Sequence, residues 1–222
     1  MGLFKQLPKL LFFLLIVRPV VYLMLGMNLL QRDRLPARGP AILAANHNSH
    51  LDTLVLMALY PLKSLPWLRP VAAADYFMRN RFTSWLSVHL IGIIPLDRQG
   101  QVDKERVFEQ CQQALADGQI LLLFPEGSRG EAEQLQPLRK GIYHLARSHP
   151  GTSVTPIALH GLGKALPKGG SMIVPFNCDA VVGGPLQVGE DCDVFMAELQ
   201  ASLEELLALC ITRRAAEEAE EE

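Results

Sequence analysis

The sequence predicts a single α/β domain in which helices flank a mostly parallel or mixed sheet, preceded by an N-terminal membrane-associated helical segment. Short apolar runs bounded by turn residues recur along the chain and are typical of strands buried on both faces. They alternate with segments of helical spacing, as in α/β folds. The 222 residues suffice for one well-buried core, and the chain begins with two long apolar runs.

The apolar start of the chain, residues 1–31, is predicted to form membrane-anchoring helices. Its two runs, Leu10–Val17 and Val20–Met27, are separated by Arg18 and Pro19. A spanning helix needs about 20 apolar residues, and an arginine at its centre raises the free energy of membrane insertion by about 2.5–3.5 kcal/mol. Proline breaks or kinks a helix. Two short helices in one leaflet therefore fit better than a straight span, with a tilted single span as the alternative. No small-residue cleavage site follows, which disfavours a signal peptide.

The remaining chain divides into a linker at 32–40, a globular domain at 41–212 and a charged, disordered tail at 213–222. Within the domain, apolar runs and helical spacing predict an alternating order of elements. The predicted strands are 41–45, 70–74, 92–96, 120–124, 154–159, 171–176 and 180–186, and the predicted helices are about 50–60, 78–90, 103–116, 138–148 and 194–210.

Composition excludes several classes of function. No basic patch interleaves with aromatic residues, so nucleic acid is not an expected partner. The four cysteines lack C-x-x-C spacing, which disfavours a zinc site or a disulfide framework and fits a reducing compartment. Basic residues dominate the first 38 positions, and such a start suits anionic lipid headgroups.

Polar clusters follow three of the predicted strands. NHNSHLD (46–52) follows AILAA, LDR (96–98) follows GIIP, and PEGSRG (125–130) comes at the end of ILLLF. Sites in such sheets lie where strands end and loops meet. The three clusters are therefore expected to converge on one crevice.

NHNSHLD admits three interpretations. Within one continuous helix, His47 and Asp52 would lie about 140° apart and could not touch. If the helix begins near Ser49, His47 can fold back and pair with Asp52, which gives a general base with an orienting carboxylate. Ser49 and Asp52 also match a capping box, S-x-x-D. A metal site of His47, His50 and Asp52 is the third interpretation, although it lacks a fourth ligand at a recognisable spacing.

FPEGSRG (124–130) indicates an anion site. Glycines let the backbone approach an anion, and Arg129 can bind phosphate bidentately. An ordinary glycine turn with a Glu126–Arg129 salt bridge is the alternative, and the spacing of a P-loop is absent. Arg98 is a second candidate anion binder. A general base and an anion-binding loop together suit one reaction. The base would take the proton from a hydroxyl of a phosphate-bearing substrate, and the resulting oxygen would attack an activated acyl carbon.

These blocks resemble the glycerophosphate and lysophosphatidate acyltransferase family, of the 1-acylglycerol-3-phosphate O-acyltransferase type. Asn46, His47 and Asp52 match its NH-x4-D block. GIIPLDR (92–98) and FPEGSR (124–129) match the second and third blocks, and VTPIAL (154–159) loosely matches the fourth. The resemblance covers about residues 38–190.

The resemblance implies that a fatty acyl group passes from a coenzyme A or acyl carrier protein thioester to a lysophospholipid, foremost 1-acylglycerol-3-phosphate. Because such thioesters are made in the cytoplasm, the active site is expected at the cytoplasmic side of the inner membrane. No metal, other cofactor or covalent acyl-enzyme is implied. His47 would be the general base and Asp52 its partner. The headgroup site would be shaped by Arg98, Glu126, Gly127, Ser128 and Arg129.

The sequence departs from the family pattern where many members carry a lysine between the first two blocks, because the stretch here is VAAAD. Oxyanion stabilisation would then come from amides near Asn48 and Ser49, or from Arg79. Ser128 and Gly130 replace the commoner Thr and Ser, which bears on headgroup preference. The alternatives are another lysolipid acceptor, a metal-dependent hydrolase, or a non-catalytic lipid-binding protein.

Overall fold

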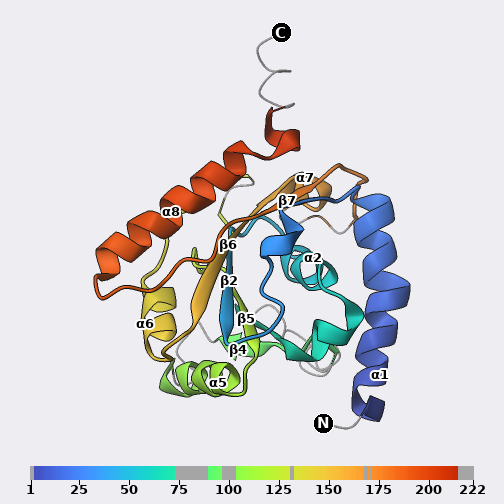
Figure 1. The fold of residues 1–222 in the computed structure, drawn as a ribbon. Helices are drawn as coiled ribbons and strands as arrows, with labels where there is room; N and C mark the ends of the chain where they lie inside the picture. The colour runs from blue at the N-terminus through green and yellow to red at the C-terminus, as the bar shows by residue number, and fades with distance from the viewer. Residues whose placement is uncertain are drawn as a thin grey trace.

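A mixed sheet forms the centre of the computed structural model, which describes residues 3–73, 90–96, 104–130, 133–167, 170 and 172–214 (Figure 1). Within these residues the sheet has seven strands in the order β1-β7-β6-β2-β5-β3-β4. Neighbouring strands are parallel except β6 and β7, which are antiparallel. The strands are β1 (Asn28–Leu30), β2 (Ala41–Ala45), β3 (Leu68–Ala73), β4 (Ile94–Leu96), β5 (Ile120–Leu123), β6 (Ser153–His160) and β7 (Asp179–Val182).

Helices cover both faces of this sheet and make a three-layered domain. Figure 1 shows α5, α6 and α8 on one side and α2 with the N-terminal helix on the other. Alternate residues of β2 explain its continuous apolar run, because Ile42 and Ala44 pack into one core and Leu43 and Ala45 into the other. The helices of the domain are α2 (Asp52–Ala58), α5 (Lys104–Ala116), α6 (Gly141–Arg147), α7 (Leu162–Ala165) and α8 (Cys192–Ala208).

The predicted fold class is confirmed, and six of the seven predicted strands are present with small shifts at their ends. The predicted strand at 171–176 is wrong for the residues described there, which are irregular. Both edges of β6 are already occupied, by β2 and β7, and the amide of Val174 donates to the carbonyl of Ala165 outside the sheet. The predicted helix at 78–90 lies, apart from its last residue, outside the described residues.

One continuous helix at the N-terminus stands where two short helices were predicted. It comprises α1 (Leu3–Phe12), the wider π-helical turns η1 (Phe13–Val17) and η2 (Val20–Met24), and the two helical residues between these turns. Proline lacks an amide donor and its ring crowds the preceding turn, and wider turns are a known way to accommodate such a disruption. Pro19 therefore lies within the helix and does not end it. We call residues 3–24 the N-terminal helix.

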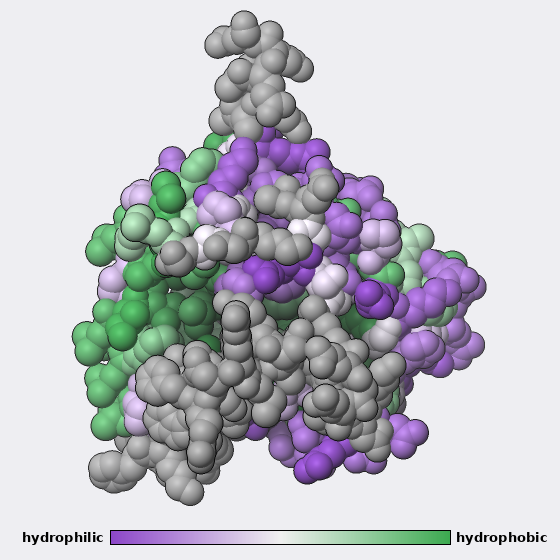
Figure 2. All heavy atoms as spheres, turned by 180° about the vertical axis from the view of Figure 1, so that it is seen from behind, coloured by the Kyte–Doolittle hydropathy of each residue, from purple (hydrophilic) through white to green (hydrophobic). Residues whose placement is uncertain are grey.

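The N-terminal helix packs one face on the domain and exposes the other. Phe13, Val17 and Val21 are buried against the core that contains α2, and Arg18 donates from Nη2 to the carbonyl oxygen of Tyr60 at 2.7 Å. Residues 6–24 are long and apolar enough to cross a membrane by length and composition. The exposed apolar side chains are Leu7, Leu11, Leu14, Leu15, Ile16, Tyr22, Leu23 and Met24, and Figure 2 shows apolar atoms gathered on this flank.

The chain joins the sheet directly after this helix. Asn28–Leu30, which the sequence placed in the anchoring segment, form edge strand β1 and pair in parallel with β7. The side chain of Asn28 donates to Asp179 Oδ1 at 2.9 Å. The N-terminal helix is therefore fixed to the domain at both its flank and its end.

Candidate active site

The polar clusters that follow β2 and β5 meet at one edge of the sheet. β2, β5 and β6 run parallel, so their carboxyl ends share this edge. Asn46 reinforces the edge, because its amide group both donates to and accepts from the backbone of Leu159 in β6, at 2.8 and 2.7 Å. The predicted convergence of NHNSHLD and FPEGSRG is therefore observed. Asp97 and Arg98 of the third cluster lie outside the described residues.

His47 and Asp52 form a hydrogen-bonded pair at the start of α2. His47 Nδ1 lies 2.9 Å from Asp52 Oδ2, and Asp52 is fully buried as the first residue of the helix. The backbone amides of Asn48 and Ser49 donate to the same oxygen at 2.7 and 2.9 Å. The strand-to-helix turn thus folds back over Asp52, which brings together two side chains that a continuous helix would keep apart.

The capping box is not formed as predicted, because Leu51 and not Ser49 precedes the first residue of α2, and no side chain caps the helix there. The Ser49 hydroxyl accepts from the amide of Leu51 at 3.4 Å, and Asp52 accepts from the amide of Ser49. Both bonds lie in the turn that leads into the helix. Asp52 therefore both stabilises the start of α2 and contacts His47.

These contacts overturn one expectation about the oxyanion. The amides of Asn48 and Ser49 are engaged by Asp52, so they are not open donors for a substrate oxygen. The other candidate, Arg79, lies outside the described residues.

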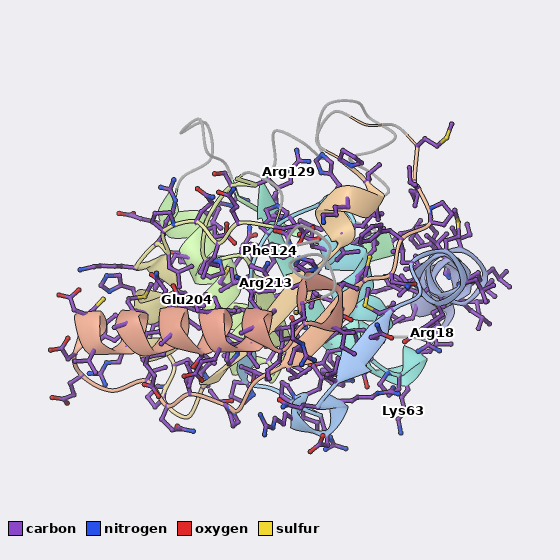
Figure 3. The ribbon with its side chains drawn as sticks, turned by 90° about the horizontal axis from the view of Figure 1, so that it is seen from above. Arg18, Lys63, Phe124, Arg129, Glu204 and Arg213 are labelled. Carbon is purple, nitrogen blue, oxygen red and sulfur yellow. The ribbon has the colours of Figure 1, made fainter. Side chains whose placement is uncertain are left out.

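Besides Asp52, two further residues hold His47, one through the ring and one through the backbone. The plane of the ring stacks on Phe124, with ring centroids 4.2 Å apart and an interplanar angle of 21°. Its backbone amide donates to Glu126 Oε1 at 2.8 Å. The side chain is 16% exposed, so the imidazole is fixed by packing while part of it still meets the surface. Figure 3 shows Phe124 near the middle of the molecule, with Arg129 of the same loop beyond it.

Glu126 is buried and links the two clusters. Its second carboxylate oxygen accepts from the amide of Gln136 at 3.2 Å, so backbone amides engage both oxygens. Burial raises the pKa of Glu126 to about 7, the two hydrogen bonds oppose that rise, and the nearby charge of Asp52 adds to it. Glu126 thus holds the backbone of His47, and its predicted place among the headgroup contacts stays a prediction.

Burial also shifts the pKa of other titratable groups near His47. It raises the pKa of Asp52, against the hydrogen bonds from His47 and the amides of Ser49 and Asn48. It lowers the pKa of His50 to about 4, with further lowering by Arg129 and His47. His50 is therefore neutral near pH 7. The hydrogen-bonded pair at this site is His47 with Asp52.

Gly127 is favoured by its backbone conformation, and the exposed side chain of Arg139 lies where a Cβ would be. Its φ is +76°, and a Cβ there would lie 2.6 Å from Nε of Arg139. That Nε donates to the carbonyl oxygen of Glu126 at 3.2 Å, and the amide of Arg139 donates to the carbonyl of Pro125 at 2.8 Å. Of the other predicted headgroup residues in this loop, Ser128 is exposed and Arg129 is half-buried.

Glu133 is a component of the site that the sequence did not indicate. Its carboxylate accepts from the amides of Gly161 and Gly163 at 3.0 and 2.9 Å and from Nδ2 of Asn48 at 3.1 Å. His160 Nε2 lies 3.7 Å away. Glu133 thus joins the loop after β5 to the turn after β2 and the end of β6. Its sequence neighbourhood, a run of polar residues, gives no pattern from which these contacts could be predicted.

No group of three or more His, Cys, Asp or Glu side chains in the described ranges is arranged to hold a metal ion. The trio of His47, His50 and Asp52 is included in that statement. The metal-hydrolase hypothesis therefore gains no ligand set from this part of the chain.

A family model described as Acyltransferase matches residues 27–160, more than half of the chain. The chloroplastic 1-acyl-sn-glycerol-3-phosphate acyltransferase of Arabidopsis thaliana is 27% identical over 191 residues, which is 85% of this chain and 51% of that protein. The lyso-ornithine lipid O-acyltransferase of Rhizobium meliloti is 27% identical over 58% of this chain and 41% of its own length. The chain spans about half the length of the curated relatives it matches.

A solved structure has the same fold. The 1-acyl-sn-glycerophosphate acyltransferase PlsC from Thermotoga maritima superposes with a TM-score of 0.61, covering 93% of this chain and 99% of that one, at 16% identity.

Proposed function

Because the chain belongs to the acyltransferase family, we propose that it moves a fatty acyl group from a thioester to the free hydroxyl of a lysophospholipid. The foremost acceptor is 1-acylglycerol-3-phosphate, and the donor is acyl-coenzyme A or acyl-acyl carrier protein. One observation supports the chemistry above all others. A partly exposed imidazole is hydrogen-bonded at 2.9 Å to a fully buried carboxylate, at the edge where sites form in this fold class.

The proposed reaction uses the two nitrogens of His47 differently. Nδ1–H donates to Asp52, which leaves the lone pair of Nε2 to take the proton of the acceptor hydroxyl. The acceptor oxygen attacks the thioester carbonyl carbon, a C–O bond forms, and the C–S bond breaks. The departing thiolate takes the proton from Nε2. Asp52 stabilises the imidazolium between these steps, and Phe124 keeps the ring in its plane.

The headgroup phosphate is proposed to bind at the loop after β5. Arg129 supplies a guanidinium near the pair, since its charge lowers the pKa of His50. The positive φ of Gly127 turns the backbone there. Ser128 and Arg98 complete the proposed contacts. Arginine and turned backbone amides together favour a phosphate monoester.

The N-terminal helix is proposed to place this site at a membrane surface. Its exposed apolar face lies beside the domain, and the lipid acceptor and product would reside in the adjoining leaflet. Thioester donors are made in the cytoplasm, so the cytoplasmic face is the expected side.

A donor-by-acceptor panel tests the proposed activity. Acyl-coenzyme A and acyl carrier protein thioesters of several chain lengths are offered with lysophosphatidate, with lyso-ornithine lipid because one relative carries that name, and with other lysolipids. We expect turnover with lysophosphatidate and full activity in excess chelator. Absence of turnover with every pair would favour the lipid-binding hypothesis, and loss in chelator would favour a metal enzyme.

His47→Ala tests the proposed base. Loss of a general base should lower the rate about 10²–10⁴-fold. His144→Ala, at an exposed position of α6, is the matched control and should retain the parent rate. Equal rates for the parent and His47→Ala, with unchanged melting temperatures, would show that His47 is not the base.

A further inference from the structure

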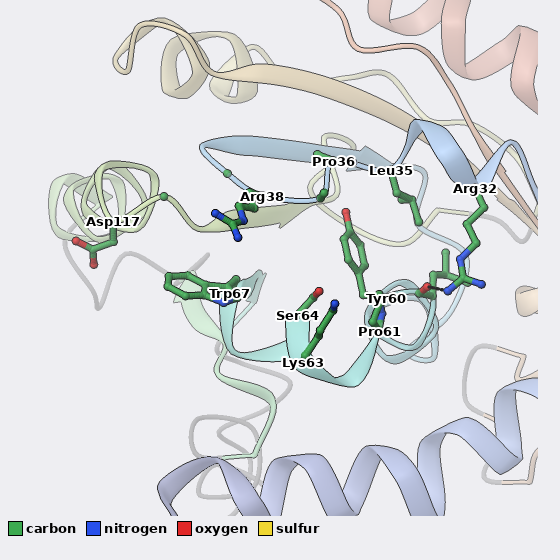
Figure 4. A pocket seen from close by; sticks show the side chains of 14 residues that line it. Arg32, Leu35, Pro36, Arg38, Tyr60, Pro61, Lys63, Ser64, Trp67 and Asp117 are labelled. Carbon is green, nitrogen blue, oxygen red and sulfur yellow. Dashed lines mark hydrogen bonds between the residues drawn. The ribbon is translucent and has the colours of Figure 1, made fainter. Parts of the chain in front are cut away.

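A second cavity lies at the opposite edge of the sheet from His47. It has a volume of about 820 Å³, and its lining comes from the segment before β2, the end of α2 with the 3₁₀ turn η4 (Leu62–Trp67), and the turn before β5 (Figure 4). The five residues of β2 separate this edge from the active-site edge. At about 3.3 Å per residue they span roughly 16 Å, so a headgroup bound here would not reach His47.

The charge of the cavity is positive. Arg32, Arg38 and Lys63 line it against one carboxylate, that of Asp117. Arg32 donates to the carbonyl of Leu59 at 3.3 Å. Arg38 and Lys63 are exposed, and neither has a hydrogen bond or ion pair with any residue that the structure describes. Two guanidinium groups and one ammonium group that line the same cavity favour the binding of a phosphate ester.

A buried hydroxyl supplies an independent observation. Tyr60 lines the cavity at 2% exposure, and its hydroxyl has no hydrogen-bond partner among the described residues. Figure 4 shows the hydroxyl directed from the residues after α2 toward Pro36. Buried polar groups in folded proteins are nearly always paired, so an unpaired donor in a cavity lined by basic side chains indicates a missing acceptor.

The cavity borders the element that carries the exposed apolar face. η4 packs against α1, and Trp67 of η4 lines the cavity with 53% of its surface exposed. The backbone carbonyl of Tyr60 accepts from Arg18 of the N-terminal helix. Tryptophan and basic side chains are typical of the headgroup level of a membrane.

We propose that this cavity is a second anion site that binds the phosphate of an anionic phospholipid headgroup. Arg38, Lys63 and the Tyr60 hydroxyl hold the phosphate, and Trp67 lies at the headgroup level. The occupant is a lipid of the supporting membrane and not the acceptor at His47. A free glycerol phosphate offers the same anion chemistry, so the test compares the two sources. The inference rests on the proposed membrane contact and is independent of acyl transfer.

Trp67 provides a local readout. The chain has two tryptophans, so Trp85→Phe leaves Trp67 as the single fluorophore. The protein is titrated with phosphatidylglycerol-containing vesicles, with phosphatidylcholine vesicles and with soluble sn-glycerol 1-phosphate. We expect a saturable change with phosphatidylglycerol alone. Arg38→Gln with Lys63→Gln should raise the half-saturating lipid concentration about 10-fold or more, because two charge-assisted contacts are lost.

Three further variants in this background make the test specific. Arg106→Gln with Arg147→Gln removes two charges from exposed positions of α5 and α6 and should leave the response intact. Arg129→Gln, at the proposed acceptor site, should also leave it intact, which separates this inference from the proposed function. Tyr60→Phe should weaken the response without lowering the melting temperature.

Several results would overturn the proposal. Equal losses in the two double variants would indicate general electrostatic attraction. A response to glycerol phosphate as strong as that to the lipid would assign the cavity to a soluble phosphate. An unchanged response in Tyr60→Phe would show that its hydroxyl faces no ligand.

Discussion

At the residue scale, two buried carboxylates and a third that is largely buried organise the surroundings of His47. Asp52 contacts the imidazole, Glu126 holds the His47 amide, and Glu133 holds the side chain of Asn48. Each also accepts from backbone amides of loops at the same edge. Burial raises the pKa of all three, and their hydrogen bonds oppose that rise. Carboxylates thus orient the histidine. Because they are shielded from water, the fold pairs them with backbone amides.

The raised pKa of Glu126 predicts a pH dependence of stability. An unfolded glutamate titrates at 4.5 and the folded Glu126 at about 7, so between these values the folded state binds more protons. Its contribution to the free energy of unfolding therefore falls as pH rises from 4.5 to 7. Glu126→Gln cannot ionise, so its melting temperature should decline less over this range. We expect a difference between the two declines on the order of 5 °C, measured by thermal scans from pH 4.5 to 8.

Glu204→Gln is the matched control for this prediction. Glu204 is exposed on α8 (labelled in Figure 3), and its replacement should leave the decline of the parent unchanged. If Glu126→Gln follows the parent curve in parallel, Glu126 titrates like an ordinary glutamate and its burial has no such consequence.

The sequence could predict part of this constellation for a physical reason. His47 and Asp52 are five positions apart, so their contact depends only on where one helix begins. Glu133 meets Gly161, 28 positions later, and Arg139 fills the space beside Gly127. Those contacts depend on how β5 and β6 lie relative to β2, which no local spacing encodes.

At the element scale, strands buried on both faces were readily predicted. A short apolar run that does not alternate with polar residues is typical of such strands in an α/β fold. Two segments were predicted wrongly, each for a different reason. SMIVPF has the composition of a strand, but no sheet edge is open to it beside β6. At Pro19 the proline rule predicted a break, yet a wider turn and packing against α2 keep the helix continuous. In both cases tertiary context outweighed local preference.

The loop after β5 gives an element-scale prediction. Gly127→Ala would place a methyl group 2.6 Å from Nε of Arg139 at a φ of +76°, which is strained for alanine. The Arg139 side chain must move aside, and its hydrogen bond to the Glu126 carbonyl is then disturbed. We expect a melting temperature lower by several degrees and an acyl-transfer rate reduced about 10-fold or more, since a displacement of 1 Å in a positioned group can cost 10²-fold. Thermal scans and the lysophosphatidate assay measure the two effects.

Gly141→Ala is the corresponding control. Gly141 begins α6, and nothing lies within 4 Å of a Cβ built there. Alanine at this position should leave the rate unchanged and hold or raise the melting temperature, because it is the better helix former. Full activity in Gly127→Ala would mean that the loop tolerates the methyl group and that this glycine has no special role.

At the scale of the whole molecule, three features occupy different sides of one sheet. The His47 pair lies at the carboxyl edge, the basic cavity lies at the opposite edge, and the exposed face of the N-terminal helix covers one flank. Figure 1 shows α8 on the far side from that helix. If the flank rests on a bilayer, both edges meet the headgroup region at the same time. A headgroup acceptor and a supporting lipid could then be bound together.

The apolar flank carries the last prediction. Leu15 is 66% exposed and Leu23 is 82% exposed, so Leu15→Glu with Leu23→Glu should leave the fold intact. Placing two carboxylates in the hydrocarbon region costs several kcal/mol on insertion scales, so vesicle binding should weaken about 100-fold or more. Flotation with vesicles measures it. The control, Val194→Glu with Leu209→Glu, adds the same charge to exposed positions at the two ends of α8 and should float like the parent. An equal loss in both pairs would reflect net charge alone, and no loss in the first pair would show that this face does not enter the membrane.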